Sequence, residues 1–165
     1  MKNDLILLFR QLTHGVYVIG VTDKEKVNAF TAAWVMQVSF RPLLIALGIN
    51  PGHSSYNMLV QGSAFSVNVL SGKNRDLAQH FGQPAKANKL AGIKWHRGKS
   101  GTPILDDAMA WFDCKYSHEC SAGDHMVVVG RVIDGAVLDT NSLPMSYHDI
   151  CNMDESSKLY PDDFL

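Results

Sequence analysis

Hydrophobic and polar residues alternate along much of this chain, with the period of two that is typical of half-buried β-strands. In residues 64–70, AFSVNVL, the side chains of Phe65, Val67 and Val69 fall on one face. Polar or turn-forming residues separate such runs, as at Asn50-Pro51-Gly52. Strands are predicted at 16–22 and 64–70, and one or two more between 28 and 49, including the buried run 43–49.

Residues 108–138 form the longest predicted hairpin, with its turn at 121–124. Alternation assigns the residues of its first strand to two faces. One face carries Phe112, Cys114, Tyr116, His118 and Cys120, and the other, solvent-facing side carries Asp113, Lys115, Ser117 and Glu119. The return strand contains a buried run of three valines.

Helical spacing occurs at both ends of the first half of the chain. Leu5, Leu8, Phe9 and Leu12 follow at i, i+3, i+4 and i+7, which predicts a covering helix over residues 3–13. A second helix is predicted over 73–81. Residues 82–103 are rich in Gly, Lys and Pro and predict a long loop, of the kind that serves as a lid or an interface arm.

Composition favours one globular domain over residues 1–165, with a core at 9–138 and a C-terminal tail at 139–165. The chain is 46% hydrophobic and 19% charged, with a net charge of −1 and no basic block, which argues against nucleic acid as a partner. The apolar run at 5–9 is too short to span a membrane. Three cysteines are too few for a disulfide framework and favour a reducing, cytoplasmic setting.

Small and polar residues gather in the stretch 28–34, NAFTAAW. Its alanines let a flat ligand approach the backbone, and Asn28 and Thr31 can hydrogen-bond the polar edge of such a ligand. A plain buried hairpin explains the same pattern without a ligand.

Ser54 and Ser55 precede a short apolar segment and are suited to the start of a helix. Two hydroxyls beside free amides also suit a phosphate, with Arg41, Lys86 or Lys89 as its cation. Helix capping without a ligand is the more common use of such serines.

Several other sites are disfavoured by spacing. The chain has no G-x-G-x-x-G for a dinucleotide, and five residues separate Gly92 from Gly98-Lys99-Ser100 where a phosphate loop has four. A zinc site is conceivable from Cys114, His118, Cys120 and His125, but the spacing matches no common zinc module, so no metal is expected.

Taken together and in order, the motifs resemble the FMN-binding split-barrel flavin reductases. The resemblance covers roughly residues 9–138. Its parts are N-x-x-T running into VSF-x-P (28–42), FSVNVLS (65–71), Phe81-Gly82, the FDC strand start (112–114), and Gly123-Asp124-His125 followed by Gly130-Arg131-Val132.

The resemblance implies a six-stranded antiparallel Greek-key barrel with short flanking helices. It also implies a homodimer that holds FMN near the subunit interface. The residues implied at the flavin ring are Phe30, Thr31, Ala32, Ala33 and Trp34, with Phe81 and Gly82 nearby; Ser54 and Ser55 would hold the phosphate, and His125 would lie beside the nicotinamide. Trp34 and Met36 depart from the family pattern, because serines are usual there.

The activity implied is NAD(P)H-dependent reduction of flavin, with FMN as cofactor or substrate and NADH or NADPH as the transient electron donor. Electrons would pass to a free acceptor or to a partner oxygenase. The alternative is a flavoprotein electron carrier or sensor that holds FMN without nicotinamide turnover. A haem-binding split barrel, with His118 or His125 as ligand, fits the motifs less well.

Overall fold

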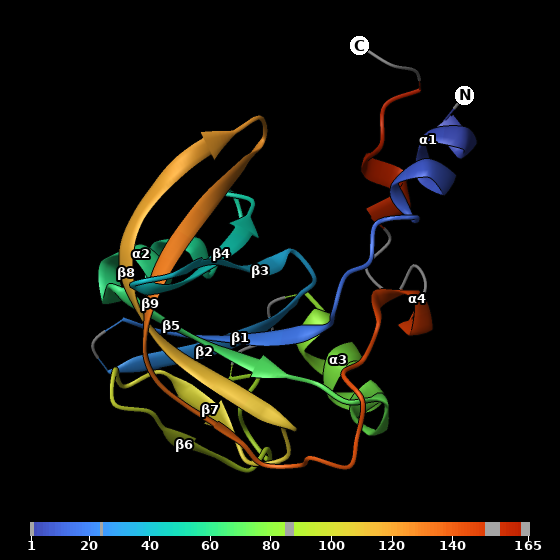
Figure 1. The fold of residues 1–165 in the computed structure, drawn as a ribbon. Coiled ribbons are helices and arrows are strands. Elements are labelled where there is room, and N and C mark those ends of the chain that lie inside the picture. Colours follow the sequence, from blue (N-terminus) through green and yellow to red (C-terminus); the bar gives the residue numbers. More distant parts are fainter. Residues whose placement is uncertain (1, 24, 85–87, 151–155, 163–165) are drawn as a thin grey trace.

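The computed structural model describes residues 2–23, 25–84, 88–150 and 156–162. Its body is a seven-stranded antiparallel sheet with the order β2-β1-β5-β8-β9-β4-β3 (Figure 1). The strands are β1 (Tyr17–Asp23), β2 (Lys26–Ala32), β3 (Val35–Phe40), β4 (Leu43–Ile49), β5 (Ala64–Val69), β8 (Ala110–Ala122) and β9 (His125–Val137). A separate two-stranded sheet contains β6 (Trp95–Arg97) and β7 (Pro103–Leu105).

The two edge strands of the large sheet are consecutive in the chain. β2 ends at Ala32 and β3 begins at Val35, so only Ala33 and Trp34 join the two edges. Three Cα–Cα steps reach about 11 Å, whereas seven strands laid flat extend over about 29 Å. The sheet therefore curls until its edges approach each other, and side chains of β1 and β3 line one cavity.

The mainly β, antiparallel prediction is confirmed, but the large sheet has seven strands where six were predicted. Residues 28–40 supply two of them, because the chain changes direction at Ala33 and Trp34. The amide of Val35 donates to the carbonyl of Ala33 (3.1 Å), and the carbonyl of Trp34 accepts from the amide of Gly48 (2.9 Å). These bonds end the pairing of β2 with β1 and begin that of β3 with β4.

The core divides into two clusters on opposite faces of β1. Val16 and Val18 pack in the first cluster, and Ile19 and Val21 in the second. The first also contains Leu70, Phe81, Leu105 and Met145, and the second also contains Leu47, Leu59, Phe65 and Val128. Burial on both faces explains why the sequence of β1 is almost continuously apolar.

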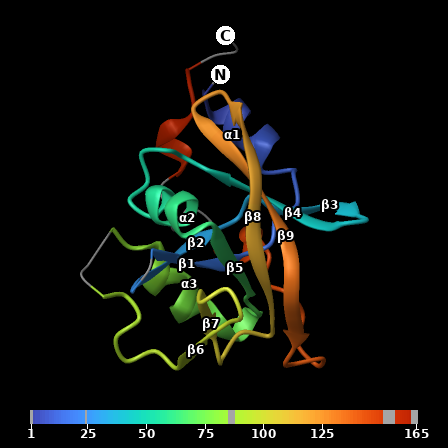
Figure 2. The same ribbon diagram turned by 90° about the vertical axis from the view of Figure 1, so that its left-hand side faces the viewer.

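Two short helices pack against the sheet near β1 and β2. α2 (Tyr56–Gly62) contacts β1 and β5, and α3 (Arg75–Gly82) contacts β2, close to the helix predicted over 73–81. Figure 2 shows both on one side of the β8–β9 hairpin, with β3 on the other. A 3₁₀ turn, η1 (Gly72–Asn74), leads into α3, and α4 (Tyr147–Ile150) and η2 (Ser156–Leu159) lie in the tail.

The predicted N-terminal covering helix is wrong in extent and position. α1 covers Lys2–Phe9, and of its predicted buried stripe only Leu5 is buried; Leu8, Phe9 and Leu12 are 46–55% exposed. The helix packs on the C-terminal segment, with the Phe9 and Tyr160 rings 5.6 Å apart, and stands away from the sheet (Figure 1). Helical spacing identifies an apolar stripe but not what covers it.

The predicted loop 82–103 is also partly structured. β6 lies inside it, and β7 begins at its last residue, Pro103. Three-residue strands are too short to produce a clear alternation, which explains why the sequence pattern missed them.

The predicted solvent exposure of the 108–138 hairpin is wrong at Asp113. Asp113 is predicted to face solvent, but the segment that contains Ser100 and Thr102 covers its side of β8, and Asp113 is fully buried. It accepts hydrogen bonds from the amide of Ser100 (2.8 Å), the Ser100 hydroxyl and the Thr102 hydroxyl (3.2 Å). Farther along β8, a register shift between Tyr116 and His118 adds Ser117 to this strand and breaks the alternation. Strict alternation fails wherever a bulge adds a residue.

Gly62 sets how closely α2 approaches β1. A Cβ at this position would overlap the backbone carbonyl oxygen of Thr22, whereas a Cβ at Gly72 would meet nothing within 4 Å. We expect Gly62→Ala to lower the free energy of unfolding by about 2–4 kcal/mol, since the clash outweighs the roughly 1 kcal/mol of helix propensity gained. Urea titration of both variants checks this, with Gly72→Ala within about 1 kcal/mol of the native chain. Equal stability of the two would contradict it.

Candidate functional site

The candidate site lies around the end of β2, where hydrogen bonds tie this strand to both helices. Asn28 Nδ2 donates to Ser55 Oγ (3.1 Å), next to the start of α2. Thr31 Oγ1 donates to the carbonyl of Ala78 in α3 (2.7 Å). The structure therefore brings together segments near residues 28, 55 and 78, which are far apart in the sequence.

The predicted cap at the start of α2 is only partly correct. Ser55 occupies the N-cap position, but its side chain makes no capping hydrogen bond and is fully buried. Its hydroxyl oxygen accepts from Asn28 instead, which leaves the hydroxyl proton available to another acceptor. Ser54 is exposed beside it.

His53 is a site residue that the sequence patterns did not single out. Its ring lies against Phe30 with centroids 4.5 Å apart, and its Nδ1 accepts from the amide of Ser55 (3.2 Å). Burial, and then the nearby charge of Lys89, lower the pKa of His53 below its ordinary value. Both observations indicate a neutral imidazole in the folded protein.

Lys89 brings a positive charge into this region. Only 7% of the residue is exposed, and its Nζ donates to the carbonyls of Phe81 (2.9 Å) and Gln83 (2.6 Å) at the end of α3. Burial lowers the pKa of Lys89. Throughout the described part of the chain, no carboxylate forms an ion pair with it. Of the three cations proposed from the sequence, Arg41 lies on the exposed β3–β4 turn and Lys86 lies outside the described residues.

Phe81 and Gly82 contribute differently. The Phe81 side chain is buried in the core, so only its backbone adjoins the site. Gly82 is exposed, and a Cβ there would lie 3.9 Å from the Thr31 side chain. The backbone at the end of α3 therefore runs beside β2.

Trp34 and His125 form the other end of the region. Their ring centroids are 4.8 Å apart, with an angle of 55° between the planes. His125 Nδ1 lies 2.8 Å from Asp124 Oδ1. The half-buried Ala32 and Ala33 connect this aromatic end to the cationic end at Lys89.

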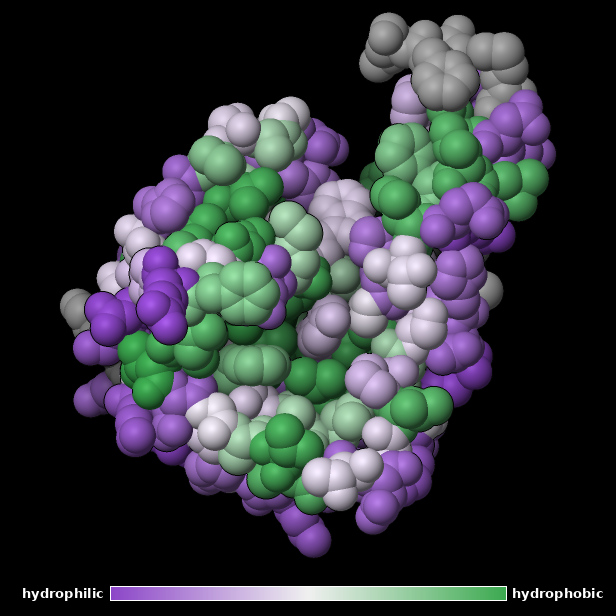
Figure 3. All heavy atoms as spheres, viewed as in Figure 1, coloured by the Kyte–Doolittle hydropathy of each residue, from purple (hydrophilic) through white to green (hydrophobic). Residues whose placement is uncertain are grey.

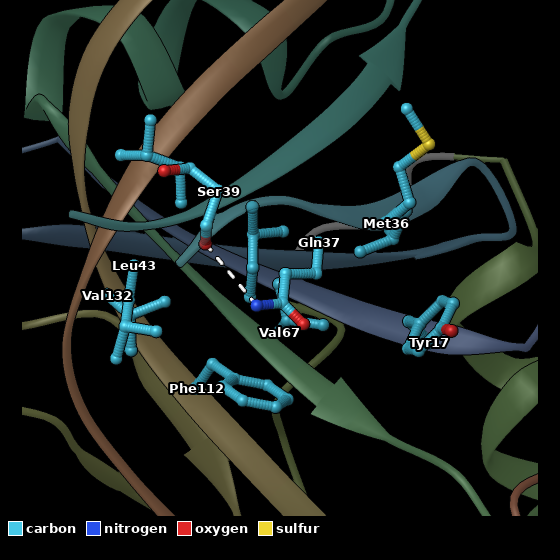
Figure 4. Close-up of a pocket in the computed structure, with 11 residues that line it drawn as sticks. Tyr17, Met36, Gln37, Ser39, Leu43, Val67, Phe112 and Val132 are labelled. Carbon is cyan, nitrogen blue, oxygen red and sulfur yellow. Dashed lines mark hydrogen bonds between the residues drawn. The ribbon is translucent and has the colours of Figure 1, made fainter. Parts of the chain in front are cut away.

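A cavity of about 320 Å³ lies beneath β3 and contains none of the predicted site residues (Figure 4). Its lining is mostly apolar and comes from six strands. The residues are Tyr17, Val35, Met36, Gln37, Ser39, Leu43, Leu44, Ile45, Val67, Phe112 and Val132. Sequence alone did not point to it, because the curl of the sheet brings these residues together.

The residues that the structure describes contain no group of three His, Cys, Asp or Glu side chains that could hold a metal ion. No helix among them is long and apolar enough to cross a membrane.

Comparisons with known proteins identify relatives of this chain. The flavin reductase like domain matches residues 9–151. A probable flavin reductase of Rhizobium meliloti is 32% identical over 125 residues, which are 75% of this chain and 40% of that protein. The chain spans about a quarter to two fifths of the length of the first curated relatives that it matches.

Two solved structures share the fold and resemble this chain in sequence. The flavin reductase component of a bacterial two-component tryptophan halogenase is 27% identical, with a TM-score of 0.80 over 91% of this chain and 95% of that one. An FMN-binding protein from Thermus thermophilus is 26% identical, with a TM-score of 0.72 over 76% and 73%. Since the family match extends over most of the chain and its strand arrangement recurs in these structures, the chain belongs to the flavin reductase like domain family.

Proposed function

We propose that this protein binds FMN and reduces it with NADH or NADPH. The observation that carries the proposal is the buried ammonium of Lys89, which has no carboxylate partner among the described residues. A buried charge is costly unless an opposite charge or several dipoles compensate it. Two carbonyls compensate part of that cost, and a phosphate would compensate the rest.

The residues of the candidate site fit both the phosphate and the flavin ring of FMN. Lys89 and the hydroxyls of Ser54 and Ser55 would hold the phosphate, since ammonium and hydroxyl groups are good phosphate donors. The short side chains of Ala32 and Ala33 would admit the flavin ring close to the backbone. When bound, FMN would supply the two-electron redox chemistry that a nicotinamide donor requires.

His125 is proposed to act at the nicotinamide. Because Nδ1 faces Asp124, Nε2 is the nitrogen that can hydrogen-bond an incoming carboxamide. Such a bond would orient the nicotinamide for hydride transfer, which requires the reacting atoms about 3–3.5 Å apart.

Anaerobic mixing of the FMN-loaded protein with NADH and NADPH tests the function. We expect rapid bleaching of the oxidised flavin band with at least one of them, because the nicotinamide transfers hydride to the flavin. An oxidised spectrum that persists with both would overturn the reductase and support an electron carrier or sensor.

Lys89→Met directly tests the proposal that Lys89 binds the phosphate of FMN. We expect the Kd for FMN to rise about tenfold or more, the size of a lost charge-assisted hydrogen bond. Binding of riboflavin, which has no phosphate, should change little. Quenching of flavin fluorescence measures both, with the exposed Lys94→Met as the matched control. Equal weakening of both flavins would contradict a phosphate at Lys89.

The acceptor is proposed to be an oxygenase or a related flavin-consuming enzyme. A structural neighbour is itself the flavin reductase component of a two-component halogenase. Reduced flavin would then leave this protein and be used by the partner.

A homodimer is proposed to form through β3. This strand is an edge of the large sheet, and the exposed apolar side chains Met36, Val38, Phe40 and Leu43 lie on it or beside it. Figure 3 shows hydrophobic residues gathered across the middle of this face. Exposed apolar edge strands are ready templates for pairing with another chain.

Phe40→Glu tests the dimer. Phe40 is 81% exposed, so the charge should not disturb the fold but should weaken an apolar interface. Sedimentation velocity should show a native dimer and a variant shifted toward monomer, while Leu143→Glu, at an 83% exposed position in the tail, stays dimeric. A monomeric native protein would contradict this assignment.

A further inference from the structure

We propose that Trp34 is a positioning residue for His125, holding the imidazole in the orientation that nicotinamide binding requires. This inference rests on the proposed reductase function. It assigns to Trp34 a contact different from its implied role beside the flavin ring.

The backbone of Trp34 is held by β4, and its half-exposed indole lies against the same strand. The amide of Gly48 donates to the Trp34 carbonyl (2.9 Å), and a Cβ on Gly48 would lie 3.2 Å from both Cβ and Cε3 of Trp34. The bare backbone of Gly48 therefore lets the indole lie close to β4. One face of the side chain rests on β4, and the His125 ring lies 4.8 Å from the indole.

Asp124 restrains the same imidazole through a hydrogen bond. A neutral His125 would donate its Nδ1 proton to Asp124 Oδ1 (2.8 Å) and present Nε2 as the acceptor. Asp124 is exposed and belongs to a turn in which Gly123 has φ +66°. A hydrogen bond to an exposed carboxylate alone restrains the ring weakly, so the indole contact supplies the remaining restraint.

Trp34 lies in the chain next to the proposed flavin site, so its contact with His125 links that site to the proposed nicotinamide site. Trp34 directly follows Ala32 and Ala33, the proposed flavin ledge, and touches the residue proposed at the nicotinamide. The indole therefore influences how far His125 lies from the proposed flavin ledge. A smaller side chain would free His125 to rotate, and an error of about 1 Å in such geometry can reduce a rate by roughly a hundredfold.

The contact is tested first without flavin. In the native protein the ring protons of His125 should show an NMR shift caused by the indole ring current. Trp34→Phe should keep part of that shift and Trp34→Leu should abolish it. Unchanged His125 signals in Trp34→Leu would overturn the proposal.

The functional part uses a double-mutant cycle on the FMN-loaded protein. We expect Trp34→Leu to slow anaerobic flavin reduction at saturating NAD(P)H about tenfold or more, with Trp34→Phe restoring most of the rate. In a His125→Ala background, Trp34→Leu should cost little further, because Trp34 acts through His125. FMN affinity, measured separately, reports any loss of flavin contact, and Phe9→Leu on α1 serves as the aromatic control.

The outcomes separate this inference from the function on which it rests. An equal loss in both backgrounds would show that Trp34 acts independently of His125 and would overturn the positioning role. A native protein that does not reduce flavin would overturn the proposed function, and the NMR comparison would then decide the Trp34–His125 contact alone.

Discussion

The constraint on which this structure depends is the two-residue connection between β2 and β3. Ala33 and Trp34 join strands at opposite edges of one seven-stranded sheet, so the sheet has to curl. The curl brings β3 over β1, creates the cavity beneath β3 and leaves β3 as an exposed apolar edge. It also puts Trp34 against Gly48 and His125. The candidate site thus lies where the curled sheet meets itself.

The two ends of the candidate site differ in charge. At one end Lys89 is a buried cation compensated by two carbonyls, and the neutral His53 lies nearby. At the other end Trp34 and His125 present aromatic surface. A ligand with an anionic tail and a flat ring matches this polarity, and FMN has both parts.

Much of the fold was predictable because alternation and turn residues are local signals. The strands at β1, β4, β5 and the long hairpin were located correctly, and motif order identified the family. Errors occurred where nonlocal packing prevails. The segment with Ser100 and Thr102 covers Asp113, the C-terminal segment packs against α1, and Asn28 binds the Ser55 hydroxyl that was predicted to cap α2.

The sequence by itself determined the β-rich class, the strand positions and the family, since each depends on residue types at fixed spacing. It also named most residues that meet at the candidate site. Only the tertiary structure decided that Lys89 supplies the buried cation, that His53 joins the site and that Trp34 lies against His125. His53 is 23 positions from Phe30 and 36 from Lys89, and Trp34 is 91 positions from His125. No local pattern encodes a distance between residues so far separated in the chain.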